Sequence, residues 1–123
     1  MAHPHPQGKQ GEDAAARYLV SRGYRVKDRN ARFKGGEIDI VAYDPRTGEL
    51  VFVEVKSRAT RTFGWPEEGV DARKRRRLQH AANCYLARQA QVFRLYRFDI
   101  IALEMDHEHG KARVVHYKNI EMG

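Results

Sequence analysis

The stretch GEIDIVAYDPRTGELVFVEVKS, residues 36–57, decides the fold of this chain of 123 residues. β-Branched and aromatic residues dominate both of its halves, and Pro45 and Gly48 supply turn chemistry between them. We therefore expect a β-hairpin with strands over Glu37–Tyr43 and Leu50–Ser57.

The pairing register of this hairpin has a chemical consequence. If Asp44 pairs with Glu49 across a four-residue turn, Asp39 lies directly opposite Glu54. Opposed side chains share a face, with Cβ atoms about 4.5 to 5.5 Å apart, and a slip of one residue would destroy the arrangement. Two carboxylates so placed repel each other unless a cation or a proton lies between them.

Hard divalent cations are the expected occupants of such a pair. Mg²⁺ and Mn²⁺ take oxygen ligands, so Asp39 and Glu54 are the candidate metal ligands and Mg²⁺ or Mn²⁺ the candidate cofactor. Lys56 follows on the same face, where it can offset charge in phosphoryl transfer or orient the attacking water. The alternative is a solvated face of an amphipathic hairpin, with Lys56 paired to Glu37. The rest of that face is apolar, which favours a cleft.

The flanking sequence predicts the other elements. Apolar spacing predicts a helix from Gly11 to Arg22 that ends at Gly23, and a second helix from about Asp71 to Gln89. Further strands are expected over residues 24–27, 97–103 and 113–117. A strand, a helix and a strand in succession usually form a right-handed parallel crossover, so the strands that end at Ser57 and begin near Arg97 should be neighbours.

These elements predict an α/β fold, a mixed central sheet flanked by helices in the order αβββαββ. Residues 1–7 are expected to form a flexible tail, and residues 8–123 a single domain, since one core is usually built from about 100 to 200 residues.

Glu12 is a candidate third acid of the site. It continues the apolar stripe of the first helix at helical spacing from Ala15, Ala16 and Leu19, and so faces inward, where a carboxylate is costly without a partner. The alternative is an acid of the first helical turn, favoured by the helix dipole.

Positive charge is concentrated in one segment. The chain has a net charge of +7, and residues 71–97 hold eight basic residues and one acid, while the rest of the chain is balanced. Such a segment favours a polyanionic partner, although a solvated charge run is the alternative. Phe63 and Trp65, in the loop before it, are candidates either to stack on bases or to anchor the loop. The candidate nucleic-acid-binding residues are Arg58, Arg73, Lys74, Arg75, Arg76 and Arg77.

Composition excludes several classes of protein. No apolar run approaches the roughly 18 residues of a membrane span, and the first residues lack the apolar stretch of a secretion signal, so we expect a cytoplasmic protein without a membrane partner. Cys84 is the only cysteine, which excludes an internal disulfide and a cysteine-based zinc cluster.

Several motifs resemble the YraN-like family of uncharacterised bacterial proteins. That family looks like a branch of the PD-(D/E)XK nuclease superfamily, which has a restriction-endonuclease-like fold, and it is similar to the archaeal Holliday-junction resolvases. The resemblance covers nearly all of residues 8–103. The motifs are Gly11-Glu12, Arg29-Asn30, Gly36-Glu37-Ile38-Asp39, Val51 to Arg58, Phe63-Gly64 and Arg97-Phe98-Asp99.

The resemblance implies a role for each site residue. Asp39 matches the first acid of the superfamily motif, Glu54 the second acid, and Lys56 the lysine, while Glu12 matches the helix glutamate of the resolvase-like branch. Ile38 departs from the pattern, because it occupies the position of the motif's proline. Metal binding and phosphodiester cleavage are the implied activities.

The expected function is therefore that of a metal-dependent endonuclease that hydrolyses DNA, with branched or structured DNA implied by resemblance. A homodimer is implied as well, since symmetric cleavage of two strands needs two sites. The first alternative is a non-catalytic nucleic-acid-binding protein that retains the nuclease fold. The second is a regulatory or scaffolding protein whose basic surface binds an acidic protein.

Overall fold

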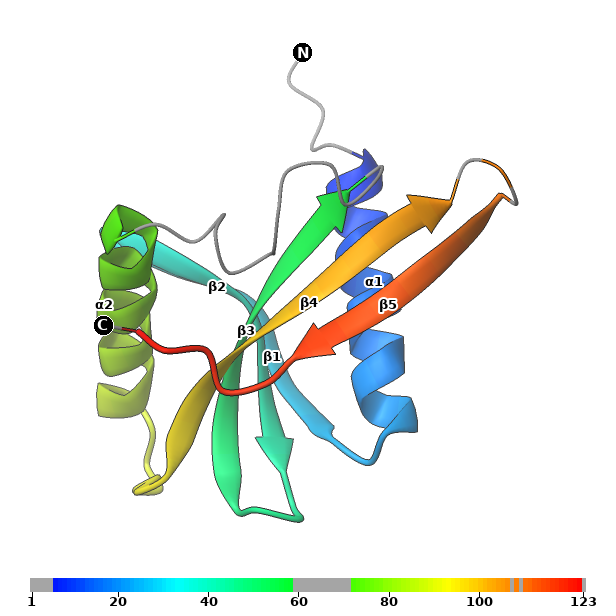
Figure 1. Ribbon diagram of the computed structural model, residues 1–123. Coiled ribbons are helices and arrows are strands. Elements are labelled where there is room, and N and C mark those ends of the chain that lie inside the picture. The colour runs from blue at the N-terminus through cyan, green and yellow to red at the C-terminus, as the bar shows by residue number, and fades with distance from the viewer. Residues whose placement is uncertain (1–5, 59–71, 107, 109, 123) are drawn as a thin grey trace.

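The computed structural model describes residues 6–58, 72–106, 108 and 110–122, in which one five-stranded mixed sheet lies between two helices (Figure 1). The strands lie in the sheet in chain order, and β3 and β4 are its parallel pair. The elements are α1 Pro6–Ser21, β1 Arg25–Phe33, β2 Gly36–Asp44, β3 Glu49–Arg58, α2 Ala72–Ala87, β4 Tyr96–Asp106 and β5 Lys111–Tyr117.

The hairpin of β2 and β3 has the register expected from the sequence. Its pairs run from Asp44 opposite Glu49 to Ile40 opposite Val53. The turn is closed by a 2.8 Å hydrogen bond from the Gly48 amide to the Asp44 carbonyl, and Gly48 adopts a positive φ of 75°. A residue without a Cβ adopts this conformation at little cost, so local turn chemistry fixes which strand residues face each other.

The parallel neighbours β3 and β4 are also as expected. Their pairing runs from Leu50 opposite Tyr96 to Arg58 opposite Glu104. This places β3 in the centre of the sheet, where both of its faces are covered. Its nearly continuous apolar run, in place of a strict alternation, follows from that position.

Two elements, β1 and α1, differ most in their bounds from the sequence expectation. β1 extends to Phe33, well beyond the expected end at residue 27, because it is an edge strand held by backbone pairing to β2 and its charged side chains point to solvent. α1 begins at Pro6 and not at Gly11. Proline suits the first helical turn, since the amide hydrogen that it lacks would have no partner there.

The sheet separates two apolar cores. On one face α2 covers a cluster that includes Val41, Leu50 and Phe52, and on the other face α1 covers a cluster that includes Ala42 and Val51. Neighbouring residues of each strand thus point into different cores, as the period of two in a strand requires. Neither described helix is long and apolar enough to cross a membrane.

Two glycines bring the helices close to one end of the sheet. A Cβ on Gly36 would lie 2.4 Å from the Arg77 carbonyl oxygen, and a Cβ on Gly11 would lie 2.6 Å from the Ser57 Oγ. The start of β2 therefore packs directly on the backbone of α2, and the end of β3 lies against α1. We call this end of the sheet, opposite the β2–β3 turn, the open end.

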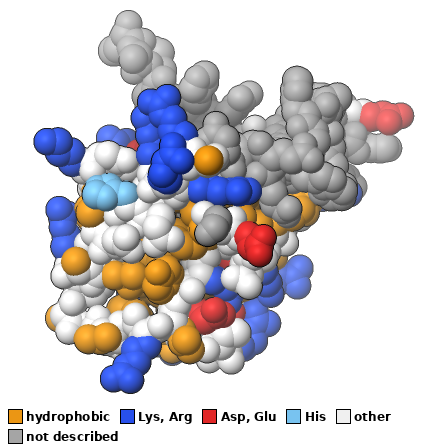
Figure 2. Space-filling view, turned by 60° about the vertical axis from the view of Figure 1, so that its left-hand side comes forward, with side chains coloured by type: hydrophobic (Ala, Val, Ile, Leu, Met, Phe, Trp, Pro, Cys, Tyr) orange, Lys and Arg blue, Asp and Glu red, His pale blue; other side chains and the backbone are white. Residues whose placement is uncertain are grey.

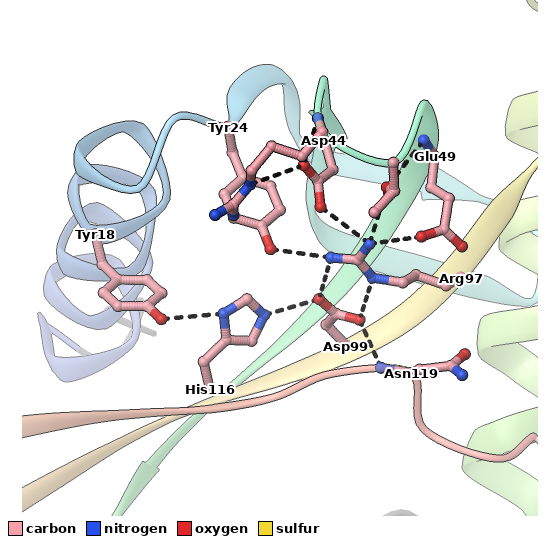
Figure 3. A network of polar contacts seen from close by, with 10 residues as sticks. Tyr18, Tyr24, Asp44, Glu49, Arg97, Asp99, His116 and Asn119 are labelled. Atoms are coloured by element: carbon pink, nitrogen blue, oxygen red, sulfur yellow. Dashed lines mark hydrogen bonds and ion pairs between the residues drawn. The ribbon is translucent and has the colours of Figure 1, made fainter.

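A buried polar network stabilises the other end, beside the β2–β3 turn (Figure 3). Arg97 is only 6% exposed, and its guanidinium donates hydrogen bonds to Asp99, Asp44 and Glu49. It donates a further bond of 3.0 Å to the Tyr24 hydroxyl. One side chain thus ties β4 to both strands of the hairpin and to the start of β1.

Asp99 is the second centre of this network. His116 Nε2 lies 2.7 Å from its Oδ2, and the Asn119 amide donates to its Oδ1 at 2.9 Å. Burial alone would raise the pKa of Asp99, but the hydrogen bonds from His116 and Arg97 hold this pKa below its usual value. The carboxylate therefore stays ionised inside the protein.

Replacement of Arg97 by Met should destabilise the protein strongly. The variant keeps most of the apolar volume but leaves Asp99 and Asp44 buried without their cation, which costs about 3 to 5 kcal/mol. The measurement is the free energy of unfolding in urea at pH 7. Arg94→Met, which removes an exposed arginine nearby, is the control and should change this free energy by less than about 0.5 kcal/mol. Equal stability of the two variants would contradict the role given to Arg97.

Candidate active site

Asp39 lies on β2 immediately beyond the last paired residues of the hairpin, Ile40 and Val53. Its Oδ2 accepts a 2.8 Å hydrogen bond from the Val55 amide of β3. The side chain thus replaces a backbone carbonyl as the acceptor where the ladder ends. This contact holds the Asp39 carboxylate near enough to Glu54 for the charge of Glu54 to act on it, although the ladder ends one pair before the expected pair of Asp39 with Glu54.

The environment of Asp39 disfavours its charged form. Burial, and then the negative charge of Glu54, raise its pKa to about 7, despite the hydrogen bond from Val55. Glu12 and Glu37 raise this pKa further through their charges. A carboxyl group that releases its proton near neutral pH is typical of a functional site.

Two lysines share one oxygen of Glu54. The Nζ of Lys74, from α2, lies 2.6 Å from Glu54 Oε1, and the Nζ of Lys56 lies 3.9 Å from the same atom. The side chain of Glu54 is 11% exposed, so this ion pair lies mostly away from solvent. Burial, followed by the neighbouring charge of Lys74, lowers the pKa of Lys56 to about 8.

The alternative pairing of Lys56 with Glu37 is not observed. Glu37 forms an ion pair with Arg32 of β1, at 3.5 Å, in which both side chains are well exposed. Lys56 instead lies against Glu54. This hairpin face is therefore not simply a solvent-exposed charged face, because its acids and its lysine meet in a partly buried cluster.

Glu12 belongs electrostatically to the same cluster. Burial raises its pKa, Arg29 and Asn30 of β1 oppose this rise, and the charge of Glu12 acts in turn on Asp39. Its Oε1 is buried and has no hydrogen-bond partner among the described residues. Since α1 begins at Pro6, Glu12 lies beyond the first helical turn, and the explanation as a first-turn acid is wrong.

A groove of about 700 Å³ opens beside this cluster. It lies between the β1–β2 turn and the N-terminal half of α2, and both Glu54 and Lys74 reach its wall. The sequence reasoning missed the contribution of the turn. The Gly35-Gly36 pair was the available signal, since it marks a close approach of two backbones. The lining residues are Arg32, Phe33, Gly35, Gly36, Glu37, Glu54, Arg73, Lys74, Arg77 and Leu78.

The basic run of α2 divides into two groups. Arg73, Lys74 and Arg77 line the groove, because they recur at the spacing of one helix face. Arg76 is exposed and Arg75 half-buried, and neither lines the groove. Figure 2 shows Lys and Arg side chains gathered over this end of α2. The expected phosphate-binding surface is thus narrower than the whole run.

Other predicted residues lie elsewhere. Arg97 contributes to the charge of the basic segment, but it is buried in the network at the β2–β3 turn and is not part of a surface. Arg58 ends β3, and its side chain lies outside the described residues, as do Phe63 and Trp65. The network itself was missed by sequence reasoning, although the alternating charged residues Arg97 and Asp99 at the start of the largely apolar strand β4 were a signal for it.

The donor set suits a hard divalent cation. Within the described part of the chain, no group of three or more His, Cys, Asp or Glu residues is arranged to hold a metal ion. Mg²⁺ and Mn²⁺, however, are commonly held by about one or two carboxylates, with water and substrate oxygens as the remaining ligands. Asp39 and Glu54 provide such a pair. The ammonium group already at Glu54 shows that this position attracts positive charge.

Comparisons with known proteins place the chain among uncharacterised bacterial proteins. The model of a family described as "Uncharacterised protein family UPF0102" matches residues 11–103. A UPF0102 protein of Symbiobacterium thermophilum is 50% identical over 79% of this chain and 80% of its own length. Relatives in Desulforamulus reducens and Moorella thermoacetica are 41% and 45% identical and cover 91% and 88% of this chain, and 92% and 88% of their own lengths.

Replacement of Asp39 by Asn should stabilise the metal-free protein at pH 8. The folded pKa of about 7 exceeds the unfolded value of about 3.9, so the folded state binds more protons between these values and stability falls as the pH rises through this window. The neutral amide of the variant would escape this cost, and its carbonyl oxygen would still accept the Val55 hydrogen bond. The expected gain in free energy of unfolding at pH 8 is about 1 to 3 kcal/mol.

The measurement is thermal and urea unfolding in EDTA at several pH values. The advantage of Asp39→Asn should shrink as the pH falls from 8 toward 5. Glu37→Gln, which neutralises an exposed acid of the same strand, should leave stability nearly unchanged. A loss of stability in Asp39→Asn at pH 8 would show that the Asp39 carboxylate is not under electrostatic stress.

Proposed function

The chain belongs to the UPF0102 family, and we propose that it is a metal-dependent endonuclease of the PD-(D/E)XK type that hydrolyses phosphodiester bonds in DNA. One observation carries this proposal. Asp39, Glu54 and Lys56 meet where the β2–β3 ladder ends, and Glu54 also lines a groove together with three arginines.

The fold supports the same proposal. A mixed five-stranded sheet between two helices, with an acid–acid–lysine set on a hairpin beside the crossover to α2, agrees with a restriction-endonuclease-like fold. Fold alone does not assign an activity, so the argument depends on the side chains at the open end.

Each site residue has a role in this mechanism. Asp39 and Glu54 would hold Mg²⁺ or Mn²⁺, which when bound polarises a phosphoryl oxygen and makes coordinated water more acidic. Lys56, with a pKa lowered to about 8, exchanges protons readily near neutral pH, which suits a group that orients or deprotonates the attacking water. Glu12 supports the cluster from α1, where its unpaired carboxylate oxygen can accept a hydrogen bond from a water molecule at the site.

The groove supplies the binding surface for the substrate. Arg73 and Arg77 offer planar guanidinium groups that bind phosphate oxygens in pairs, and they lie in the N-terminal half of α2, where the helix dipole favours anions. Arg32 extends the positive lining from β1. DNA with branches or other structure is the substrate class that the resemblance to resolvases adds, and a homodimer would be needed for symmetric cuts.

A second candidate function is nucleic-acid binding without cleavage. The observation in its favour is the 2.6 Å ion pair of Lys74 with Glu54, which already neutralises a carboxylate that the metal would need. This candidate keeps the groove and its arginines but predicts no metal-dependent product.

The cleavage test compares wild type with three site variants. Single-stranded, duplex and four-way-junction DNA are incubated with Mg²⁺ or Mn²⁺, and the products are resolved on gels. Asp39→Asn, Glu54→Gln and Lys56→Met should each lower the cleavage rate about 100-fold or more. A fourth variant, Glu12→Gln, should lower it by about tenfold, as expected for a residue that contacts the site through water and does not itself hold the metal.

The matched control for this test is Glu121→Gln, which removes an exposed acid that does not line the groove and should cleave at nearly the wild-type rate. Equal cleavage by wild type and all three site variants would refute the site. Salt-sensitive DNA binding without cleavage by wild type would favour the second candidate function.

The binding test uses charge reversal in the groove. Arg73→Glu with Arg77→Glu should weaken DNA binding strongly and reduce the slope of log affinity against log salt by about 2, since each lost phosphate contact removes roughly 0.9. Binding is measured by fluorescence anisotropy from 50 to 300 mM salt in EDTA. Arg17→Glu with Arg22→Glu makes the same change in net charge at exposed arginines of α1 and its C-terminal end and should leave the slope nearly unchanged. Equal effects of the two pairs would contradict a localised binding surface.

A further inference from the structure

Lys74 and Glu54 connect the proposed metal site with the groove that would bind nucleic acid. Glu54 lies on β3 at the proposed metal position and Lys74 lies on α2, and both side chains line the groove. Their charged atoms are 2.6 Å apart. A direct ion pair therefore links the metal position to the binding surface.

We propose that Lys74 is a positioning residue that occupies Glu54 in the metal-free protein and moves to a substrate phosphate when a divalent cation binds, so that metal and nucleic acid strengthen each other's binding. This inference rests on the proposed function. It adds a thermodynamic link between the cofactor and the substrate at the same site.

The competition for Glu54 follows from charge and distance. An ammonium group at hydrogen-bond distance from Oε1 occupies the space of a metal ion at that oxygen, and the two positive charges would repel strongly where Glu54 is shielded from water. Lys56 already lies 3.9 Å from Oε1, so the positive charge near this atom is high before any metal arrives. One cation must leave.

Lys74 is better placed to leave than Lys56. Its side chain is 37% exposed, compared with 23% for Lys56. Four rotatable bonds allow the Lys74 ammonium to turn into the groove, which its own residue lines, while Lys56 lies on the central strand of the sheet. In the groove, Arg73 and Arg77 would hold phosphates within reach of the displaced ammonium.

This exchange would make the binding of metal and the binding of nucleic acid cooperative. Without nucleic acid, the metal ion must break the ion pair of Lys74 with Glu54, and no phosphate in the groove compensates for this cost. With phosphate in the groove, Lys74 exchanges one anion for another and the cost to the metal falls. By reciprocity, the bound metal must favour nucleic acid to the same degree.

The test measures Mn²⁺ affinity, by electron paramagnetic resonance or calorimetry, with and without a phosphorothioate duplex that resists cleavage. Without DNA, Lys74→Met and Lys74→Gln should each bind Mn²⁺ about tenfold more tightly than wild type, a typical size for coupling between two sites. DNA should tighten Mn²⁺ binding about tenfold in wild type but less than about twofold in either variant.

Arg77→Met is the matched control, since it removes a positive charge from the same groove at a residue one helical turn beyond Lys74. It should change Mn²⁺ affinity without DNA less than about threefold, because its charge acts only from a distance. Unfolding curves check that each variant is folded. Tighter Mn²⁺ binding in both Lys74 variants, with coupling to DNA lost, supports the exchange.

Two different failures can be distinguished. If wild type and the Lys74 variants bind Mn²⁺ equally and Glu54→Gln abolishes that binding, the exchange is refuted while the metal site stands. If no protein binds Mn²⁺, or Glu54→Gln binds it as wild type does, both the proposed metal site and the exchange are wrong. If Arg77→Met had the same effect as Lys74→Met, the exchange would also be wrong. The loss of any positive charge from the groove would then explain the tighter Mn²⁺ binding.

Discussion

Asp44 pairs with Glu49 across the β2–β3 turn, and this register determines where Asp39, Glu54 and Lys56 lie. It places Asp39 just beyond the last rung of the ladder, where its carboxylate accepts a hydrogen bond from the Val55 amide. The same register directs Glu54 toward α2 and keeps it out of the core under α1. Because side chains alternate along a strand, a shift of one residue would exchange the core and site faces and dismantle both.

The two ends of the sheet differ in how completely their buried charges are paired. Beside the β2–β3 turn, Arg97 neutralises Asp99 and Asp44, so the buried charges at that end are paired. At the open end, Asp39 has a raised pKa, and Glu12 Oε1 has no hydrogen-bond partner in the described part of the chain. Natural proteins tolerate such local cost at functional sites when the rest of the fold compensates for it. The satisfied end thus supports a hairpin whose other end is left in need of a cation.

Lys74 partly fills that need within the protein itself. It lies on α2, which packs so closely on Gly36 that a Cβ there would meet the Arg77 carbonyl. The close approach holds the backbone of the helix, from which Lys74 and the groove-lining arginines extend, beside the start of β2. Helix packing, and not only the hairpin, therefore shapes the candidate site, and the site joins segments that are far apart in the sequence.

The sequence by itself determined the hairpin, its register, the parallel neighbours and the place of Asp39 and Glu54, because these depend on local turn chemistry and on the period of two in a strand. Only the tertiary structure decided that Lys74 contacts Glu54, that the basic run divides between groove and surface, and that Arg97 lies inside. Periodicity predicts the face of a residue but not the end point of a long, flexible side chain. That end point is set by the charges which distant segments bring within reach.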